Sequence, residues 1–225
     1  MKAFIFCGGF GTRMKSYESI KPKPLVKINN IEIIKYIIDI LISNKIKDIN
    51  LLCGYKINQF KEFKKKFDIK NNNKIKLNII NTGYNSNTFE RLRRIKNTLA
   101  KEEFFLVTYG DSIANFSLKK SLANIKSNDI ANILVFQKRN SVGTVNLSKN
   151  KINSFQEKEY ININAGFYIF SNKILNFFKR KNKSLEKDIL PKLAKMNKVS
   201  YTLTNYWQPI DKKENISEFK NHLNK

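Results

Sequence analysis

Short apolar runs alternate with amphipathic helical patterns along the chain, and this alternation limits its fold more than any other feature of the sequence. Apolar residues that recur at three- and four-residue spacing are typical of helices packed on one face. We expect strands near residues 2–7, 49–53, 76–80, 104–108, 131–137, 152–156, 165–170 and 199–203. We expect helices near residues 31–42, 57–67, 86–100, 117–126, 171–180, 184–197 and 211–223. The alternation predicts an α/β fold in which helices cover both faces of a mostly parallel sheet.

The region after residue 130 is richer in strand patterns than the region before it. Residues 142–147 and the polar residues near 149–152 are typical of a strand and turn in an antiparallel hairpin. A chain of 225 residues can bury one substantial core. We therefore expect a single domain that spans residues 1–225.

The longest apolar region, residues 31–42, is interrupted by Glu32, Lys35 and Asp39. It falls short of the roughly 20 unbroken apolar residues that a membrane span needs. The sequence enters a strand pattern at once and reaches Gly8 before the apolar core of a signal peptide could form. We therefore expect a cytoplasmic protein with no membrane contact.

The chain is strongly basic. Lysine and arginine together number 43 against 18 acidic residues, which gives a net charge of +25. The lysines are scattered over many segments, whereas nucleic-acid-binding surfaces usually combine arginine clusters with exposed aromatic residues. In the sequence only residues 91–94 resemble such a cluster. We expect no nucleic-acid partner, although the positive field should attract anionic substrates such as nucleotides.

Residues 8–24, GGFGTRMKSYESIKPKP, follow the first apolar run directly. Glycines at such a point let backbone N–H groups approach phosphate oxygens without interference from a Cβ atom. Pro22 and Pro24 restrict the residues before them to extended conformations, so Lys21 and Lys23 are held on a stiffened segment. A glycine turn after a strand also forms for steric reasons alone, and the segment has neither the P-loop nor the GxGxxG spacing. Together, the glycines and lysines predict a binding site for phosphate groups.

Two aspartates are candidate metal ligands. Asp111 follows the apolar run 104–110, and open α/β sheets present ligand groups at the carboxyl ends of their strands. A carboxylate that faces phosphates there suits Mg²⁺, which takes one or two carboxylates plus phosphate oxygens. Asp211 follows Trp207 and a proline, which restrain the segment before it. Each aspartate could instead cap the helix that follows it.

Few other side chains are candidates for chemistry. The single histidine, His222, lies near the end of the sequence, which excludes Ser-His-Asp and Cys-His nucleophiles and His-based metal sites. Cys7 and Cys53 lie at the ends of predicted strands without a partner pattern, and we expect buried, reduced thiols. Glu157 and Lys158 stand among apolar strand residues, where they are costly unless they meet a polar ligand or each other. A surface ion pair is the alternative.

Six short motifs occur in a fixed order along nearly the whole chain. They are GGFGTR (8–13), PKP (22–24), GD (110–111), FQEK (155–158), NAG (164–166) and WQPID (207–211). In this combination and order, the chain resembles the sugar-phosphate nucleotidyltransferases. Within that family the pattern is most similar to the glucose-1-phosphate cytidylyltransferases.

The resemblance implies a Rossmann-like three-layer fold with a mostly parallel mixed sheet and a small antiparallel sugar-binding lobe. It places nucleotide binding at about residues 1–130 and sugar-phosphate binding at about residues 131–225. The implied reaction is Mg²⁺-dependent transfer of a nucleotidyl group, from CTP first of all, to a sugar 1-phosphate, glucose 1-phosphate first of all. The products are an NDP-sugar for surface glycan synthesis and pyrophosphate.

Several alternatives stay open. The enzyme could be a guanylyl-, uridylyl- or thymidylyltransferase for another sugar or small phosphate. The chain could also be a catalytically silent, nucleotide-binding regulatory subunit of the same fold. Assembly into a homo-oligomer also stays open.

The resemblance also assigns residues by position. Nucleotide-binding residues are Gly8, Gly9, Gly11, Thr12, Arg13, Lys23, Gly83, Thr88 and Asp111. Sugar-phosphate-binding residues are Arg91, Gly143, Glu157, Lys158, Asn164 and Gly166. Catalytic residues are Arg13, Lys23, Asp111 and Lys158, and Mg²⁺ ligands are Asp111 and Asp211. One departure from the family pattern concerns Phe89 and Glu90, which replace a Gly-Gly pair and are expected to fill or charge a pocket for the base or sugar.

Overall fold

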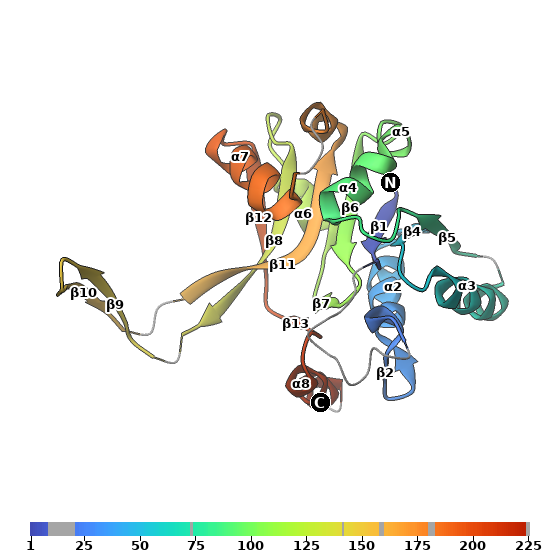
Figure 1. Ribbon diagram of the computed structural model, residues 1–225, viewed down its shortest axis with the longest axis horizontal. Coiled ribbons are helices and arrows are strands. Elements are labelled where there is room, and N and C mark those ends of the chain that lie inside the picture. Colours follow the sequence, from blue (N-terminus) through green and yellow to red (C-terminus); the bar gives the residue numbers. More distant parts are fainter. Residues whose placement is uncertain (9–20, 73, 141, 158–159, 180–182, 224–225) are drawn as a thin grey trace.

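The computed structural model describes residues 1–8, 21–72, 74–140, 142–157, 160–179 and 183–223. Its centre is a seven-stranded sheet in the order β12-β8-β11-β6-β1-β4-β5 (Figure 1). The strands are β1 (Ala3–Phe6), β4 (Asp48–Cys53), β5 (Lys76–Asn81), β6 (Phe104–Tyr109), β8 (Ala131–Arg139), β11 (Tyr160–Ser171) and β12 (Val199–Thr204).

Most neighbouring strands in this sheet run parallel. Strands β6, β1, β4 and β5 form one parallel group, and β12 is parallel to β8. Strand β11 runs antiparallel to both β6 and β8 and so joins the two groups. The two parts of the chain therefore contribute strands to one sheet. This architecture confirms the expected α/β fold with a mostly parallel mixed sheet.

Two layers of helices bury the two faces of the sheet. The alternation of side chains along β1 shows why: Ala3 and Ile5 join one apolar cluster, while Phe4 and Phe6 join the other. The first cluster includes residues of α2 (Ile33–Ser43), α3 (Ile57–Asn71), α6 (Leu118–Ala123) and α8 (Lys213–Leu223). The second includes residues of α4 (Thr88–Arg94), α5 (Lys96–Leu99), η3 (Asn172–Phe177), η4 (Leu185–Ile189) and α7 (Leu190–Lys195). Among the described residues, no helix is both long and apolar enough to cross a bilayer.

Small strand pairs surround the main sheet. Strand β7 (Ser112–Ala114) pairs antiparallel with β13 (Trp207–Pro209), and β2 (Lys27–Ile28) pairs with β3 (Ile31–Glu32). Strands β9 (Thr144–Ser148) and β10 (Lys151–Gln156) form a hairpin that projects away from the body of the molecule (Figure 1). The expected hairpin is confirmed, and nearly all of its residues are exposed.

The structure corrects two expected helices. The helix expected over 86–100 is divided at Ile95 into α4 and α5. The region 184–197 begins as the π-helical turn η4 and becomes regular only in α7. Pro191 lies at the start of α7 and has no backbone N–H, so it cannot donate the bond that a continuous α-helix through this point requires.

Candidate active site

The candidate site lies where β1 and β6 end side by side. Phe6 pairs with Tyr109 in parallel register, so Gly8 and Asp111 leave the sheet at the same edge. In the strand order, β4 lies on one side of β1 and β6 on the other, which makes this edge a topological switch point. Ligands of open α/β sheets bind at such points.

Lys23 and Asp111 meet at this edge. Lys23 Nζ lies 2.7 Å from Asp111 Oδ2, and the side chains are 11% and 36% exposed. Lys23 begins the short 3₁₀ helix η2 (Lys23–Leu25), so the extended conformation expected for the residue before Pro24 is wrong at Lys23, whereas Pro22 before it has φ −57° and ψ 140°. A Cβ atom on Gly110 would lie only 2.9 Å from Phe6 O and from Pro24 Cγ, so glycine is what allows this close approach.

Asp211 is brought to the same place by the pairing of β7 with β13. Pro209 lies opposite Ser112, and the N–H of Ile210 donates to Asp111 O at 2.8 Å. Trp207 Nε1 also donates to Ser112 Oγ at 2.9 Å. This side-chain bond is a second connection between β13 and β7. The two aspartates therefore belong to chain segments joined by backbone hydrogen bonds.

This donor set fits Mg²⁺. The described part of the chain contains no group of three or more His, Cys, Asp or Glu side chains placed to hold a metal ion. A site with one or two carboxylates is nevertheless typical of Mg²⁺, because substrate phosphates and water complete its six ligands. Asp111 and Asp211 are the residues that could hold it, and neither is fully buried.

The carboxylate of Glu186 is a part of this region that the sequence did not reveal. Tyr109, at the end of β6, donates its hydroxyl to Glu186 Oε1 at 2.5 Å. Thr88 Oγ1 lies 2.9 Å from the same oxygen, and Ser184 Oγ donates to Oε2 at 3.0 Å. Burial, together with Tyr168 and Glu186, raises the pKa of Tyr109, so its hydroxyl remains a donor. An acidic residue in the first turn of a helix is an ordinary helix-stabilising feature, and no pattern distinguished Glu186 from one.

The same network continues into the second part of the chain. Tyr168 OH donates to Tyr109 OH at 3.3 Å, and Asn164 Nδ2 donates to Tyr168 OH at 2.7 Å. Gly166 has φ +77°, and a Cβ atom there would lie 2.6 Å from the Tyr109 ring. The resemblance places Asn164 and Gly166 in sugar-phosphate binding. Asn164 is thus linked to Tyr109 through Tyr168, and Gly166 packs against the Tyr109 ring.

Three assigned residues lie around helix α4. Thr88 begins the helix and bonds Glu186, and Gly83 precedes it with φ +89°. Arg91 is only 3% exposed, and its guanidinium donates to Gly8 O at 2.7 Å. Arg91 therefore lies inside the protein, beneath the strand ends.

The structure shows where Phe89 and Glu90 lie. Phe89 is fully buried, and its ring packs edge-on against Phe178 at 5.1 Å. Glu90 bonds the guanidinium groups of Arg93 and Arg94 on its own helix. Phe89 therefore belongs to the core and Glu90 to the surface of its own helix, and their effect on the base or sugar site stays a prediction.

The expected setting of Glu157 is also wrong. Glu157 is exposed at the end of the projecting hairpin, and its neighbour Phe155 is 64% exposed. A two-stranded hairpin that leaves the sheet has solvent on both faces, so the apolar residues around Glu157 do not bury it. Gly143 lies beside it, since a Cβ atom on Gly143 would lie 3.1 Å from Glu157 Oε1.

Several assigned residues lie outside the described part of the chain. They are Gly9, Gly11, Thr12, Arg13 and Lys158. Their roles remain predictions from the sequence.

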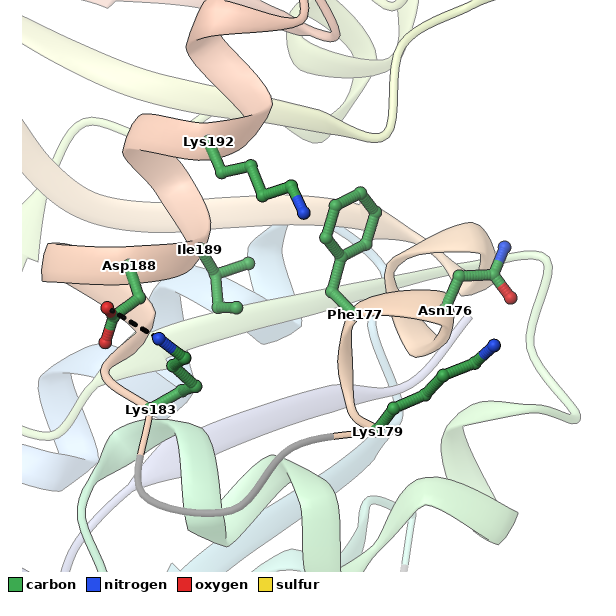
Figure 2. Close-up of a pocket in the computed structure, with 7 residues that line it drawn as sticks. All are labelled: Asn176, Phe177, Lys179, Lys183, Asp188, Ile189 and Lys192. Atoms are coloured by element: carbon green, nitrogen blue, oxygen red, sulfur yellow. Dashed lines mark hydrogen bonds and ion pairs between the residues drawn. The ribbon is translucent and has the colours of Figure 1, made fainter.

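A separate cavity of about 410 Å³ lies beside η3, η4 and α7 (Figure 2). Its lining includes Lys179, Lys183 and Lys192, and Lys183 pairs with Asp188 at 3.4 Å. None of the assigned residues lines it. We place the site at Lys23 and Asp111 because a cation and a carboxylate meet there at the strand ends, whereas the cavity is lined by three lysines, one of them paired with Asp188, and by amide and apolar side chains.

Known proteins resemble this chain over almost its full length. It is 27% identical to the glucose-1-phosphate cytidylyltransferase of Salmonella typhimurium, over 94% of this chain and 91% of the relative. It is 30% identical to the D-glycero-alpha-D-manno-heptose 1-phosphate guanylyltransferase of Campylobacter jejuni, over 97% and 98%. The crystal structure of HddC from Yersinia pseudotuberculosis complexed with GMP-PN shares the fold, with a TM-score of 0.73 and 23% identity over 99% of both chains.

The family model described as nucleotidyl transferase matches residues 2–225. That range includes all the segments that form the site, from β1 before Gly8 to Asp211 after β13. It also includes every strand of the central sheet. The chain belongs to the nucleotidyl transferase family.

Proposed function

We propose that the protein transfers a nucleotidyl group from a nucleoside triphosphate to a sugar 1-phosphate and releases pyrophosphate. CTP and glucose 1-phosphate are the leading substrate pair, as the order of motifs indicates. The single observation that carries the proposal is the Lys23–Asp111 pair at the switch point of the sheet. In this pair Lys23 would contact phosphate oxygens and Asp111 would hold a metal ion, at the edge where open α/β sheets bind ligands.

The reaction needs no protein nucleophile. A phosphate oxygen of the sugar 1-phosphate attacks the α-phosphorus in line, the bond to the β-phosphate bridging oxygen breaks, and pyrophosphate takes the negative charge. Two polyanions must approach each other for this step, so positioning and charge neutralisation carry most of the rate. Lys23 supplies positive charge on the triphosphate side, and we assign Arg13 and Lys158 the same role for the leaving group and the sugar phosphate.

Mg²⁺ held by Asp111 and Asp211 would neutralise charge on the triphosphate. Lys23 balances the charge of Asp111 at 2.7 Å. Arrival of a triphosphate gives Lys23 a second anionic partner and leaves Asp111 able to turn toward a cation. Asp111 is 36% exposed and keeps access to water when it turns.

A second substrate pair is GTP with a heptose 1-phosphate. The observation that favours it is the Campylobacter jejuni relative, which is 30% identical and matches over 98% of its own length. Both pairs use the same site chemistry and differ in the base and the sugar.

The deciding experiment measures pyrophosphate release from CTP, GTP, UTP and dTTP, each with glucose, mannose and heptose 1-phosphates. We expect release to be highest with CTP and glucose 1-phosphate, and highest release from GTP with the heptose would establish the second pair. If no substrate pair gives pyrophosphate release but the protein binds a nucleotide tightly, the protein is a regulatory subunit and the proposal is wrong.

A further inference from the structure

The three parallel strands β1, β4 and β5 are each followed closely by a glycine at the carboxyl edge of the sheet: Gly8, Gly54 and Gly83. Arginines of helix α4 occupy the space beside Gly8 and Gly83, whereas the backbone of Gly83 lies against Gly54. A Cβ atom on Gly8 would lie 2.1 Å from Arg91 Cζ, and one on Gly54 would lie 2.2 Å from Gly83 O and 3.2 Å from Arg91 Nη1. A Cβ atom on Gly83 would lie 2.4 Å from Arg94 Nη1.

The guanidinium group of Arg91 bonds all three strand ends at once. Its Nη2 donates to Gly8 O at 2.7 Å, after β1. Its Nη1 donates to Cys53 O at 3.2 Å, at the end of β4, and to Thr82 Oγ1 at 2.6 Å, just after β5. The planar fork of arginine can make such a set of bonds from one rigid group, which the point charge of a lysine cannot.

The charge of Arg91 has no carboxylate partner in the described part of the chain. The neighbouring arginines differ, since Arg93 and Arg94 both pair with Glu90 on the helix surface. Arg91 is 3% exposed, and burial lowers its pKa, yet a guanidinium stays protonated in proteins. A buried cation without a counter-charge is costly unless its hydrogen bonds serve the fold or an anion binds nearby.

We infer that Arg91 is a positioning residue for the triphosphate site: it fixes the carbonyl of Gly8, the first glycine after β1, and adds positive charge with no carboxylate partner among the described residues. This inference rests on the proposed function. It differs from the role that the resemblance gave Arg91, because the side chain acts through the backbone of Gly8 and its bonds are directed into the strand ends.

The test is a double-mutant cycle of Gly8→Ala, Arg91→Met and the combined variant. In Gly8→Ala the added methyl group overlaps the guanidinium group of Arg91. In the combined variant this guanidinium group is gone, so the overlap is relieved. Arg91→Lys keeps the charge but cannot bond three strand ends. Arg93→Met is the matched control, because it removes one positive charge from the same helix at a residue outside the strand ends. Each protein is measured by urea unfolding and by the KM values for triphosphate and sugar 1-phosphate.

We expect Gly8→Ala to lower the urea midpoint in the wild-type background and to lower it much less in the Arg91→Met background. We expect Arg91→Met and Arg91→Lys to raise the KM for the triphosphate by about ten-fold or more, the factor that corresponds to about 1.4 kcal/mol, with the KM for the sugar phosphate nearly unchanged. The control variant should change neither KM by more than about two-fold.

Two results would overturn the inference. Additive effects of the two substitutions on unfolding would show that Gly8 and Arg91 are not coupled. A rise in the KM for the sugar phosphate alone would show that Arg91 binds that substrate directly. If no substrate pair reacts, the proposed function fails, but the unfolding cycle still decides whether Arg91 holds Gly8.

Discussion

Lys23 Nζ and Asp111 Oδ2 lie 2.7 Å apart although 88 positions separate the two residues in the sequence. Pro22, which precedes Lys23, and Gly110, which precedes Asp111, make this contact possible. Pro22 holds the approach to Lys23 extended, and the absence of a side chain at Gly110 lets Pro24 pack against the end of β6. The ion pair therefore depends on the segment that contains Pro22 and Pro24 and on the end of β6.

We expect Lys23→Met to raise the KM for the triphosphate or lower kcat by at least about ten-fold, because one charge-assisted contact to phosphate is worth about 1.5–3 kcal/mol. The free energy of unfolding should fall by less than about 1 kcal/mol, since Asp111 keeps access to water. Steady-state kinetics and urea unfolding measure the two effects. Lys35→Met is the matched control, because Lys35 forms an exposed pair with Asp39 on α2. Equal kinetic losses in both variants would contradict a specific role for Lys23.

Asp111→Asn tests the metal assignment. The amide keeps the shape of the side chain but removes the charge that a Mg²⁺ ligand needs, so we expect turnover to be abolished and the fold to be retained. Pyrophosphate release is measured across a range of Mg²⁺ concentrations, with circular dichroism as the check on folding. Near-normal release at low Mg²⁺ would show that Asp111 is not a metal ligand.

The sequence predicted the centre of the main sheet well because β1 and β4 are buried on both faces. Ala3–Phe6 is wholly apolar, Asp48–Cys53 is mostly apolar, and neither contains an exposed residue. Such runs leave few alternatives to a central parallel strand. The position of Asp111 also followed from a local rule, since it comes directly after a strand. Lys23 lies in a short helical turn and not in the extended conformation that the flanking prolines predicted. The short strands β7 and β13 were missed, because three residues carry too little pattern to identify a pair that forms only through tertiary contact.

Contacts between distant segments could not be predicted. Glu186 receives hydrogen bonds from Thr88 and Tyr109, which lie 98 and 77 positions away. Arg91 lies beneath Gly8, 83 positions away, and nothing in the arginine-rich segment 91–94 showed which arginine would point inward. The hairpin was expected, but its projection into solvent was not, since apolar residues in β10 predicted a buried strand.

Gly166→Ala should destabilise the fold by about 1–3 kcal/mol, because φ is +77° and the added methyl would lie 2.6 Å from the Tyr109 ring. Urea unfolding measures the loss. Gly143→Ala is the matched control, since the added methyl there meets the exposed ring of Phe155 at 3.0 Å. That variant should change the free energy of unfolding by no more than about 0.5 kcal/mol. Similar losses in both proteins would show that the Tyr109 contact is not what requires glycine at 166.

The pH dependence of unfolding reports on Tyr168. Burial raises the pKa of Tyr168 to about 12 from an ordinary value of 10.0, so the folded protein keeps this proton at pH values where the unfolded chain has lost it. The resulting stabilisation is fully present below pH 10 and falls between pH 10 and 12, by about 1.4 kcal/mol per pH unit for one group. In Tyr168→Phe this component is absent, so the difference in unfolding free energy between wild type and variant should narrow as pH rises from 9 to 11. A constant difference would contradict the raised pKa.

The bond between Tyr109 and Glu186 is tested by a double-mutant cycle. Glu186 accepts from Tyr109, Thr88 and Ser184, and a glutamine in its place presents an N–H₂ group to at least one of those donors. We therefore expect Glu186→Gln to lower the free energy of unfolding by about 1–3 kcal/mol, as does loss of a hydrogen bond to a charged group. Tyr109→Phe removes one donor and should cost a similar amount. The combined variant should cost less than the sum, because both single substitutions break the same bond. Since Tyr109 directly precedes Gly110 and Asp111, the same variants should also lower kcat more than Lys35→Met does. Full additivity with unchanged kcat would show that Glu186 serves only the local helix.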